Sequence, residues 1–511
     1  MAAAAGTSSH LAYAVDEAPV LPALHQLPGV ARVAPPRTTT RTETRYDTAG
    51  GALGRHGVGL YRIEDGHGTR WGCTLFPDGA ADAPSITAAP GTESAPHLAA
   101  LQDARGPDAP AGLLEHLQSV LRGRAPEPVE TAVVSTLTYE LLDAAGNSSG
   151  SIRDETVQFR SAGVGGDPSA PNRRFWRAED LPEALLEKVR AEFEQAGARP
   201  AGKGHGPQWM AGARREPGEE PAEADSPVGA LLMYYLRRQY GELLHHDPRV
   251  RQGGTDAIHK MRVATRRLRS ALSSYRSTLD PEPARKLRSE LRWLAGVLGE
   301  ARDAQVMRHR LQAMVAAEPA DLVMGPVAAR VDEELLYDYR QAYGRVRGAL
   351  NSERYFLALD GLEALIEDPP WTETSRQPAG KAAARMIRRD RRRLRRRVHR
   401  ARGLSGEDHA AALHDARKDA KRLRYAAEVW EPVQPTEAKA MVDAAEHVQK
   451  ILGEHQDSVV TRQYLRRMGA SAGAAGENGF TYGRLHALEE AHAKAAEEHF
   501  AHAWKGFPSS P

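Results

Sequence analysis

The chain has 511 residues, of which 41% are hydrophobic and 27% charged, a globular composition on a chain too long for a single hydrophobic core. Its one cysteine, Cys73, excludes an internal disulfide and a metal site built from several thiolates. The apolar start of the chain is interrupted by His10, Asp16 and Glu17 and has no basic lead. We therefore expect neither a signal peptide nor membrane insertion, and predict a cytoplasmic protein.

The formal net charge of +2 conceals two different halves. Residues 1–220 carry 21 Lys and Arg against 28 Asp and Glu, a balance of −7. Residues 221–511 carry 48 against 39, a balance of +9. The asymmetry points to a polyanionic partner for the second half, whether nucleic acid, a phosphate polymer or a membrane surface.

Residues 1–200 are predicted to form an α+β domain. β-branched and aromatic residues at period two, bounded by turn residues, predict strands at 45–51, 57–63, 70–76, 131–141 and 151–159. Helices are expected at 111–122 and 182–195. The segment that follows is rich in Gly, Pro, Ala and Glu, a composition that resists packing, and we place an interdomain linker at 201–224.

Residues 225–511 are predicted to be an all-α domain, because their apolar residues recur at spacings of three and four. Repeat one is placed at 225–367 and repeat two at 379–506, on either side of a proline-rich break. The expected helices span residues 228–246, 255–279, 282–317, 323–350, 353–366, 380–402, 407–431, 435–468 and 481–505.

Two segments of the helical half match each other. Residues 259–269 and 414–424, which lie 155 positions apart, both follow the pattern His-x-x-Arg-x-x-x-(Arg or Lys)-Arg-Leu-Arg. Downstream, Leu298–Glu300 and Leu452–Glu454 both read Leu-Gly-Glu, and an aspartate lies three residues beyond each triplet. The match indicates that one helical unit has been duplicated.

Each repeat places a stripe of cations along one helix face. At about 100° per residue, positions 0, 3, 7 and 10 after the histidine fall within an arc of about 80°. Apolar side chains occupy the opposite arc, so we expect the stripe to face away from the bundle core. A basic face is often only solvated surface. Here, however, like charges repel at this spacing in both copies, and guanidinium groups suit the oxygens of a phosphate ligand.

The two histidines leave two readings open. No second His, Cys or acidic residue lies at a ligand spacing in both copies, so we expect no metal and no cofactor. His259 and His414 are expected either to contact phosphate, with binding that strengthens as pH falls, or to act as hydrogen-bonded residues at a helix start. Asp303 and Asp457 are expected to hold stripe arginines in place or to be purely structural.

On these motifs the chain resembles the CHAD family, the conserved histidine α-helical domain, over about residues 222–511. The resemblance implies two pseudo-symmetric four-helix bundles around a basic central cleft that binds inorganic polyphosphate, and in some members a location at polyphosphate granules. Carried over residue by residue, with the neighbouring cations of the repeats, the binding set is His259, Arg262, Arg266, Arg267, Arg269, His414, Arg417, Lys418, Lys421, Arg422 and Arg424. A basic helix before the second histidine adds Arg385, Arg388, Arg389, Arg392 and Arg396, and predicts stronger binding by the second half.

The first 200 residues resemble the CYTH family of triphosphate tunnel enzymes in the order of Tyr46–Ala49, Gly57–Arg62 and the hairpin Asp143–Val157. The family's Glu-x-Glu-x-Lys motif is missing, with Leu11–Val15 in its place, and Trp71–Phe76 replaces a lysine-bearing strand. Without paired carboxylates, metal-assisted hydrolysis is not expected. The domain is interpreted as a degenerate, incomplete CYTH-like β-tunnel without catalytic residues.

The expected function is therefore non-enzymatic binding of inorganic polyphosphate. Two alternatives remain: a divalent-metal-dependent triphosphatase in residues 1–200, and a cleft that binds nucleic acid, which would compete with polyphosphate. The two matching histidine segments, 259–272 and 414–427, lack the interleaved aromatic residues that base stacking requires, apart from Tyr425. The sequence identifies no protein partner.

Overall fold

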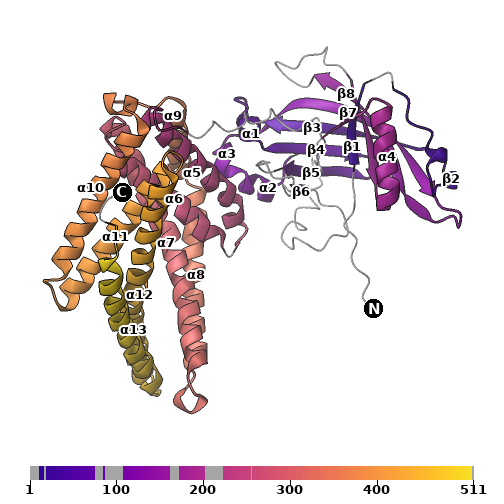
Figure 1. Cartoon of the computed structure of the whole chain (residues 1–511). Helices are drawn as coiled ribbons and strands as arrows, with labels where there is room; N and C mark the ends of the chain where they lie inside the picture. The colour runs from indigo at the N-terminus through magenta and orange to yellow at the C-terminus, as the bar shows by residue number, and fades with distance from the viewer. Residues whose placement is uncertain are drawn as a thin grey trace. The chain divides into compact units, whose positions relative to one another are not determined.

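The chain forms two compact units, Met1–Gly218 and Glu219–Pro511. The computed structural model describes residues 11–16, 19–74, 85–86, 108–161, 172–201, 222–254 and 256–508. The described strands belong to the first unit and the long helices to the second (Figure 1). This order confirms the predicted α+β domain followed by an all-α domain. Most of the predicted linker, residues 202–221, lies outside the described residues.

The first unit is built on one antiparallel sheet with the strand order β10-β1-β9-β8-β7-β3-β4-β5-β6, and β2 pairs with β7. Its longest strands, β7 (Glu127–Leu142) and β8 (Ser148–Ser161), form a hairpin. Asp143 fixes the turn by accepting backbone N–H groups of Ala145 and Asn147. The other described strands are β1 (Leu11–Val15), β2 (Arg32–Val33), β3 (Arg37–Asp47), β4 (Gly59–Asp65), β5 (Gly68–Thr74), β6 (Ser85–Ile86), β9 (Arg173–Glu179) and β10 (Arg199–Pro200).

Short helices cover the sheet. At one end, α4 (Glu183–Gln195) packs Val189 and Phe193 onto buried Trp176. A second core holds buried Cys73 among residues of α1 (Ala52–Arg55), α2 (Ala111–His116) and α3 (Gln118–Leu121). The strand predicted at 45–51 ends at Asp47, because the Asp47 carboxylate accepts the backbone N–H groups of Leu53 and Gly54 and so fixes the turn into α1.

The helical unit contains the predicted duplication. Four helices of the first copy correspond in order to four of the second, and α9 (Glu353–Glu367) stands between the copies. The first copy comprises α5 (Val228–Arg251), α6 (Ala257–Ser274), α7 (Pro281–Ala317) and α8 (Val327–Leu350). The second comprises α10 (Ala379–Ala401), α11 (Gly406–Trp430), α12 (Pro435–Ala474) and α13 (Phe480–Lys505). Short 3-10 helices are η1 (Leu24–Gln26), η4 (Ala320–Leu322) and η5 (Glu373–Arg376).

Most predicted helix ends agree with these bounds to within a few residues. Three ends differ by five or six residues: α6 ends at Ser274 instead of 279, α12 continues to Ala474 instead of ending at 468, and α5 continues through Pro248 to Arg251 instead of ending near residue 246. The buried Arg251 bonds the Asp247 carboxylate at 2.6 Å and the carbonyl oxygen of Leu350 at 2.7 Å. The pair with Asp247 within the helix and the tertiary bond to Leu350 hold the last helical turn despite the backbone N–H that proline lacks.

The two copies begin side by side. Pro227 and Pro378, which precede α5 and α10, form an antiparallel bridge. The backbone N–H of Val228 donates to Gln377 O, and that of Ala379 donates to Ser226 O, both at 2.8 Å. This reciprocal pair of hydrogen bonds places equivalent points of the repeats next to each other.

The copies also share a hydrophobic core at the far ends of their long helices. The hairpins α7–α8 and α12–α13 run side by side there (Figure 1), and one cluster draws Leu311 and Val331 from the first and Leu465 and Leu485 from the second. Arg310 crosses between the copies and donates to Glu489, which is fully buried, at 2.7 Å and 2.9 Å. The predicted pair of four-helix copies is therefore interlocked.

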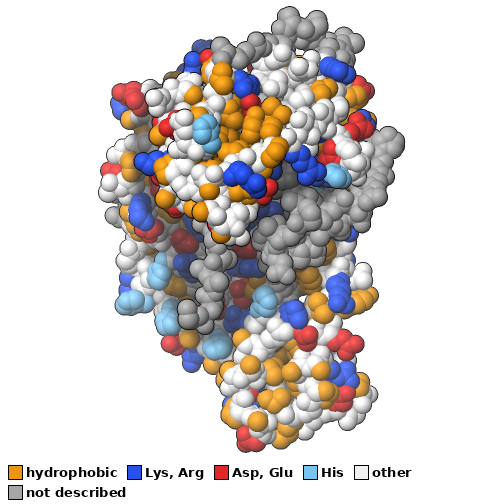
Figure 2. All heavy atoms as spheres, turned by 90° about the vertical axis from the view of Figure 1, so that its right-hand side faces the viewer, with side chains coloured by type: hydrophobic (Ala, Val, Ile, Leu, Met, Phe, Trp, Pro, Cys, Tyr) orange, Lys and Arg blue, Asp and Glu red, His pale blue; other side chains and the backbone are white. Residues whose placement is uncertain are grey.

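The surface mixes both charge signs. Figure 2 shows one face of the chain, on which Lys and Arg side chains lie among acidic and uncharged ones. Because the charges are mixed in this way, any strongly cationic site must come from local geometry.

Within the described ranges, no helix is both long and apolar enough to cross a membrane.

We predict that loss of the Arg310–Glu489 pair strongly destabilises the helical unit. Replacing Arg310 by Ala leaves the Glu489 carboxylate buried without its partner, which costs about 3–5 kcal/mol. The matched control is Arg345→Ala, which breaks the exposed pair with Glu300 and should cost less than about 1 kcal/mol. Urea unfolding followed by helical circular dichroism measures both, and equal midpoint shifts for the two variants would contradict the assignment.

Candidate functional site

The repeated histidine helices, α6 and α11, pack against each other. Their apolar faces are buried as predicted, with Met261 and Leu268 in the first copy and Ala416 and Leu423 in the second. The hydroxyl of buried Tyr275 donates to the carbonyl oxygen of Ala426 and ties the end of α6 to α11. The cationic stripes of both copies are thereby brought to one place.

Four cations meet there, at positions 3 and 7 after each histidine: Arg262, Arg266, Arg417 and Lys421, which we call the central cation cluster. Burial lowers the pKa of the Lys421 amine to about 6, and the charges of Arg266, Arg417 and Arg262 contribute to the shift. Burial and the charges of Arg262, Arg269 and Arg417 likewise lower the pKa of Arg266. The sequence suggested that the stripe faces away from the core. Instead, its members are half-buried between the helices, because each stripe faces the other copy.

The repeated Leu-Gly-Glu triplet seats the arginine at position 3. A Cβ atom added to Gly299 would lie 3.5 Å from Arg262 Nε, and one added to Gly453 would lie 3.2 Å from an Arg417 terminal nitrogen. Each glycine thus leaves room for a guanidinium group against the neighbouring long helix. Four residues later, Asp303 pairs with Arg262 at 3.3 Å and Asp457 with Arg417 at 3.9 Å. The expected role of the two aspartates in holding stripe arginines agrees with this geometry.

The cluster is not arranged for stability. The buried Nε atoms of Arg262 and Arg417 have no hydrogen-bond acceptor in the described part of the chain, and such unsatisfied donors carry a free-energy cost. Burial raises the pKa of the Asp457 carboxyl, which weakens its capacity to neutralise the cations beside it. The central cation cluster therefore holds positive charge and hydrogen-bond donors that the described residues do not fully satisfy.

Most of the cations at positions 8 and 10 after each histidine are neutralised by carboxylates. Arg267 pairs with Glu428 at 2.9 Å, and Arg424 pairs with the same carboxylate at 3.1 Å. Arg422 pairs with Asp390 at 3.3 Å and also donates to the carbonyl oxygen of Ser273. These three predicted site residues join helices to one another.

Arg269 extends the cluster onto α7. Its pKa is lowered by burial and by the charges of Arg292 and Arg288, and these three arginines form no ion pair with a described carboxylate. At the other end of α6, Arg302 lies near His259. Sequence reasoning missed all three α7 arginines, although Arg288 and Arg292 share one helix face at a spacing of four.

Both histidines are half-buried. His259 is the third residue of α6, but His414 is the ninth residue of α11, so the expectation of a residue at a helix start is wrong for His414. Burial lowers the pKa of His259, and the charge of Arg302 adds to the effect. Burial also lowers the pKa of His414, with Lys418 and Arg417 contributing, while a hydrogen bond to Gln456 opposes the shift. Among the described residues, no three His, Cys, Asp or Glu side chains form a group that could hold a metal ion.

The arginines of α10 divide into paired and exposed ones. Arg389 pairs with Asp390 and donates to the carbonyl oxygen of Ser274, while Arg385 donates to Gln377. Arg388, Arg392 and Arg396 are exposed. No interaction found among the described residues links these five to the central cation cluster, and exposed Lys418 is paired with Asp415.

The sheet of the first unit carries buried carboxylates, contrary to the sequence-based expectation. Glu43 on β3 and Glu155 on β8 are both buried and both pair with Arg41, at 2.6 Å and 3.2 Å. Arg177 on β9 also pairs with Glu155, at 2.7 Å. The two carboxylates lie far apart in the sequence, so neighbouring residues gave no signal of their pairing.

The lowered pKa of the Lys421 amine predicts that the stability of the helical unit depends on pH. Its pKa is about 6 in the folded chain and about 10.4 when unfolded, so the unfolded state binds more protons between these values. This group's contribution to stability therefore rises with pH across that window. Lys421→Met should stabilise the helical unit more at pH 7 than at pH 9. Urea unfolding of both proteins at the two pH values measures this, and an equal gain at both would contradict it.

Known proteins resemble this chain at two levels. The family model for the CHAD domain matches residues 234–466. Two Mycobacterium tuberculosis proteins, uncharacterized protein MT2285 (strain CDC 1551 / Oshkosh) and uncharacterized protein Rv2226 (strain ATCC 25618 / H37Rv), are each 31% identical over 490 residues. The similarity covers 93% of this chain and 91% of each relative, so it extends over both units.

Two solved structures are also similar. PptA from Streptomyces chartreusis is 23% identical with a TM-score of 0.47, and the match covers 55% of this chain and 100% of that one. The CHAD domain from the plant Ricinus communis has the same identity and TM-score, with coverage of 60% and 99%. The family model covers both histidine repeats, and the relatives cover nearly the whole chain. The chain therefore belongs to the CHAD family.

Proposed function

We propose that the helical unit binds inorganic polyphosphate through the central cation cluster, extended by Arg269, Arg288 and Arg292. The observation that carries the proposal is the crowding of half-buried cations from both repeats. Burial, together with the charges of these neighbours, lowers the pKa of Lys421 to about 6. A polyanion supplies the negative charge that the surrounding carboxylates do not. Arginine is suited to this role because its planar fork donates two hydrogen bonds to one phosphate group.

The extent of the cation surface favours a chain of phosphates over a single phosphate ion. His259 and Arg269 lie ten residues apart on α6, which corresponds to about 15 Å at 1.5 Å per residue. Arg302 lies near the first end, and Arg288 and Arg292 near the second. A flexible linear polymer with a charge on every unit can contact all of these groups together.

A specific observation disfavours nucleic acid at the same cluster. Tyr425, the aromatic residue of the matching segment 414–427, is only 5% exposed and is flanked by Arg267 and Arg424. Its ring is therefore not available to stack on a base. Polyphosphate should displace single-stranded DNA of equal charge from the full-length chain at fixed salt, and the reverse order of affinity would favour the nucleic-acid alternative.

The proposal predicts a loss of affinity when one cluster arginine is removed from each repeat. Arg266→Ala with Arg417→Ala should weaken polyphosphate binding about a hundredfold, since a hydrogen bond to a charged group contributes about 1.5–3 kcal/mol. The salt dependence should also fall, by about one counterion per cation removed. Calorimetric titration of the full-length chain at two salt concentrations measures both effects.

A control removes the same number of positive charges elsewhere. Arg345→Ala with Arg376→Ala deletes two exposed arginines that pair with Glu300 and Glu373, and it should leave affinity nearly unchanged. Equal losses in the two double variants would mean that net charge, and not the cluster, determines binding.

Binding should also be coupled to proton uptake. Arg262 and Arg266 on α6 and Arg417 on α11 disfavour protonation of Lys421, whereas Asp457 on α12 favours it. A bound polyanion raises the pKa of the amine, so affinity should increase as pH falls toward 6. Titrations at pH 7 in buffers of different ionisation enthalpy measure the protons taken up. Lys421→Arg should retain binding while losing part of this uptake, and any remainder is assigned to His259 and His414.

We also propose that the first unit is not catalytic. Arg41 and Arg177 pair with the buried carboxylates of Glu43 and Glu155. Arg174 pairs with buried Asp154 and Arg45 with buried Asp47, which leaves little negative charge to hold a divalent ion. The full-length chain should release no phosphate from tripolyphosphate with Mg²⁺ or Mn²⁺. Release that disappears in Glu43→Gln would establish the triphosphatase alternative instead.

A further inference from the structure

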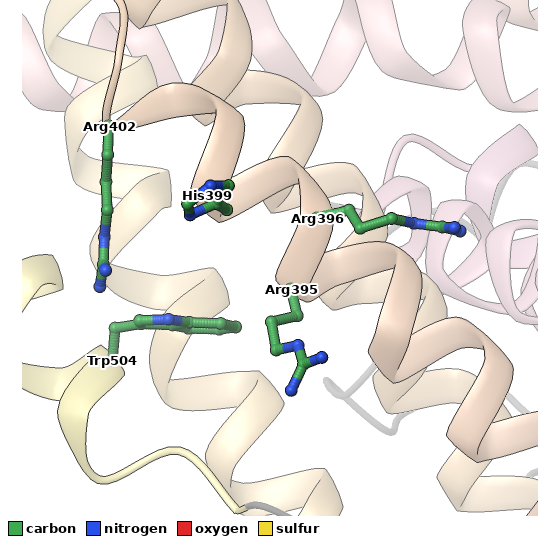
Figure 3. A pocket seen from close by; sticks show the side chains of 5 residues that line it. All are labelled: Arg395, Arg396, His399, Arg402 and Trp504. Atoms are coloured by element: carbon green, nitrogen blue, oxygen red, sulfur yellow. The ribbon is translucent and has the colours of Figure 1, made fainter.

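A second cationic site lies at the C-terminal end of α10. A cavity of about 460 Å³ is lined by four basic side chains from the end of α10 and its following turn, and by one aromatic residue from the last turn of α13. These residues are Arg395, Arg396, His399, Arg402 and Trp504 (Figure 3). A cavity of this size falls in the range of small-ligand sites, about 300–1,000 Å³.

The basic residues of this cavity differ from others on the same helix. Arg393 pairs with Asp419 at 2.7 Å, and Arg397 pairs with Asp415 at 3.4 Å, which docks α10 onto α11. Arg395 lies about 200° around the helix from Arg393, on a different flank. Across the described residues, none of the four basic side chains of the cavity forms an ion pair, and Arg395 lowers the pKa of neighbouring Arg391. The cavity therefore holds positive charge that no carboxylate of the described residues offsets.

Trp504 is held in position as an aromatic wall. Phe507 stacks on it with a centroid separation of 4.7 Å and an interplanar angle of 22°, and Phe500 packs nearby at 6.0 Å. Arg391 Nε donates to the carbonyl oxygen of Pro508 at 2.8 Å and ties the end of the chain to α10. Figure 3 shows the indole edge-on, with Arg402 extending toward it, Arg395 beside its ring and His399 across the cavity.

We propose that this cavity binds a free nucleoside triphosphate, with the base on Trp504 and the phosphates on Arg395 and Arg402. A linear polyphosphate has no aromatic group for an indole wall, and a neutral aromatic compound has no need of several guanidinium groups. A nucleotide combines a flat π surface with a compact anionic tail, which matches the two kinds of group that line the cavity. Arg396 points away from Trp504 (Figure 3) and contributes long-range charge.

The site is independent of the proposed polyphosphate function. Its residues do not belong to the central cation cluster, and α10 uses its opposite flank to contact α11. The full-length chain carrying Arg266→Ala and Arg417→Ala is therefore the background for the test, because a triphosphate could otherwise also bind at the cluster.

The experiment is a calorimetric titration of that background with ATP, tripolyphosphate and adenosine. ATP should bind more tightly than either fragment. Trp504→Leu should weaken ATP binding at least about fivefold, the lower bound for loss of one base–aromatic contact, and should leave tripolyphosphate binding unchanged. Trp504→Phe should retain most of the ATP affinity. Arg395→Ala with Arg402→Ala, both at exposed positions, should weaken ATP and tripolyphosphate alike.

Several outcomes overturn the proposal. One is equal binding of ATP and tripolyphosphate with no effect of Trp504→Leu, which would make the cavity a second polyphosphate contact. Another is no ATP binding at all by a background protein whose circular dichroism is unchanged. A third is tighter binding of a short oligoadenylate than of ATP, which would assign the cavity to a nucleic-acid strand. If Trp504→Leu unfolds the chain, the comparison of Trp504→Phe with the arginine double variant decides.

Discussion

Repulsion between like charges at the contact of α6 and α11 is the constraint on which the helical unit depends. Arg262, Arg266, Arg417 and Lys421 are held together although burial and the neighbouring positive charges lower the pKa of Lys421 and of Arg266. The rest of the unit supplies the opposing free energy through the reciprocal hydrogen bonds where the copies begin, the core shared by the long hairpins and the buried Arg310–Glu489 pair. A strained cationic site therefore requires interlocked copies.

Duplication explains the form of this site. Each repeat contributes a cation at position 3, a second at position 7, a glycine that leaves room for the first, and an aspartate that orients it. Two equivalent half-sites that face each other suit a ligand that is itself repetitive, because successive units of one polymer can satisfy both halves. A single small anion would use only part of the arrangement.

The sequence predicted the helices and the repeated cations well, because helical periodicity and internal repeats are local signals. It did not predict which cations are neutralised. The partners of Arg267 and Arg422, Glu428 and Asp390, lie on other helices or in the other repeat, and their proximity depends on packing. For the same reason, the sequence did not predict the burial of the stripe. Nor did it predict that Glu43 and Glu155 both pair with Arg41. Each requires knowledge of which surfaces meet.

Ion pairing, more than the number of arginines, separates structural from ligand-binding charge in this protein. On α10, Arg393 and Arg397 face carboxylates of α11 and fix the position of the second repeat, whereas Arg395 and Arg402 face Trp504 and no described carboxylate. Arginines a few residues apart on α10 therefore have different roles. A carboxylate neutralises the arginine that pairs with it, whereas an exposed arginine beside an aromatic ring keeps its charge. The overall net charge of +2 is compatible with intense local fields, since many arginines pair with carboxylates and the unpaired ones can attract an anion.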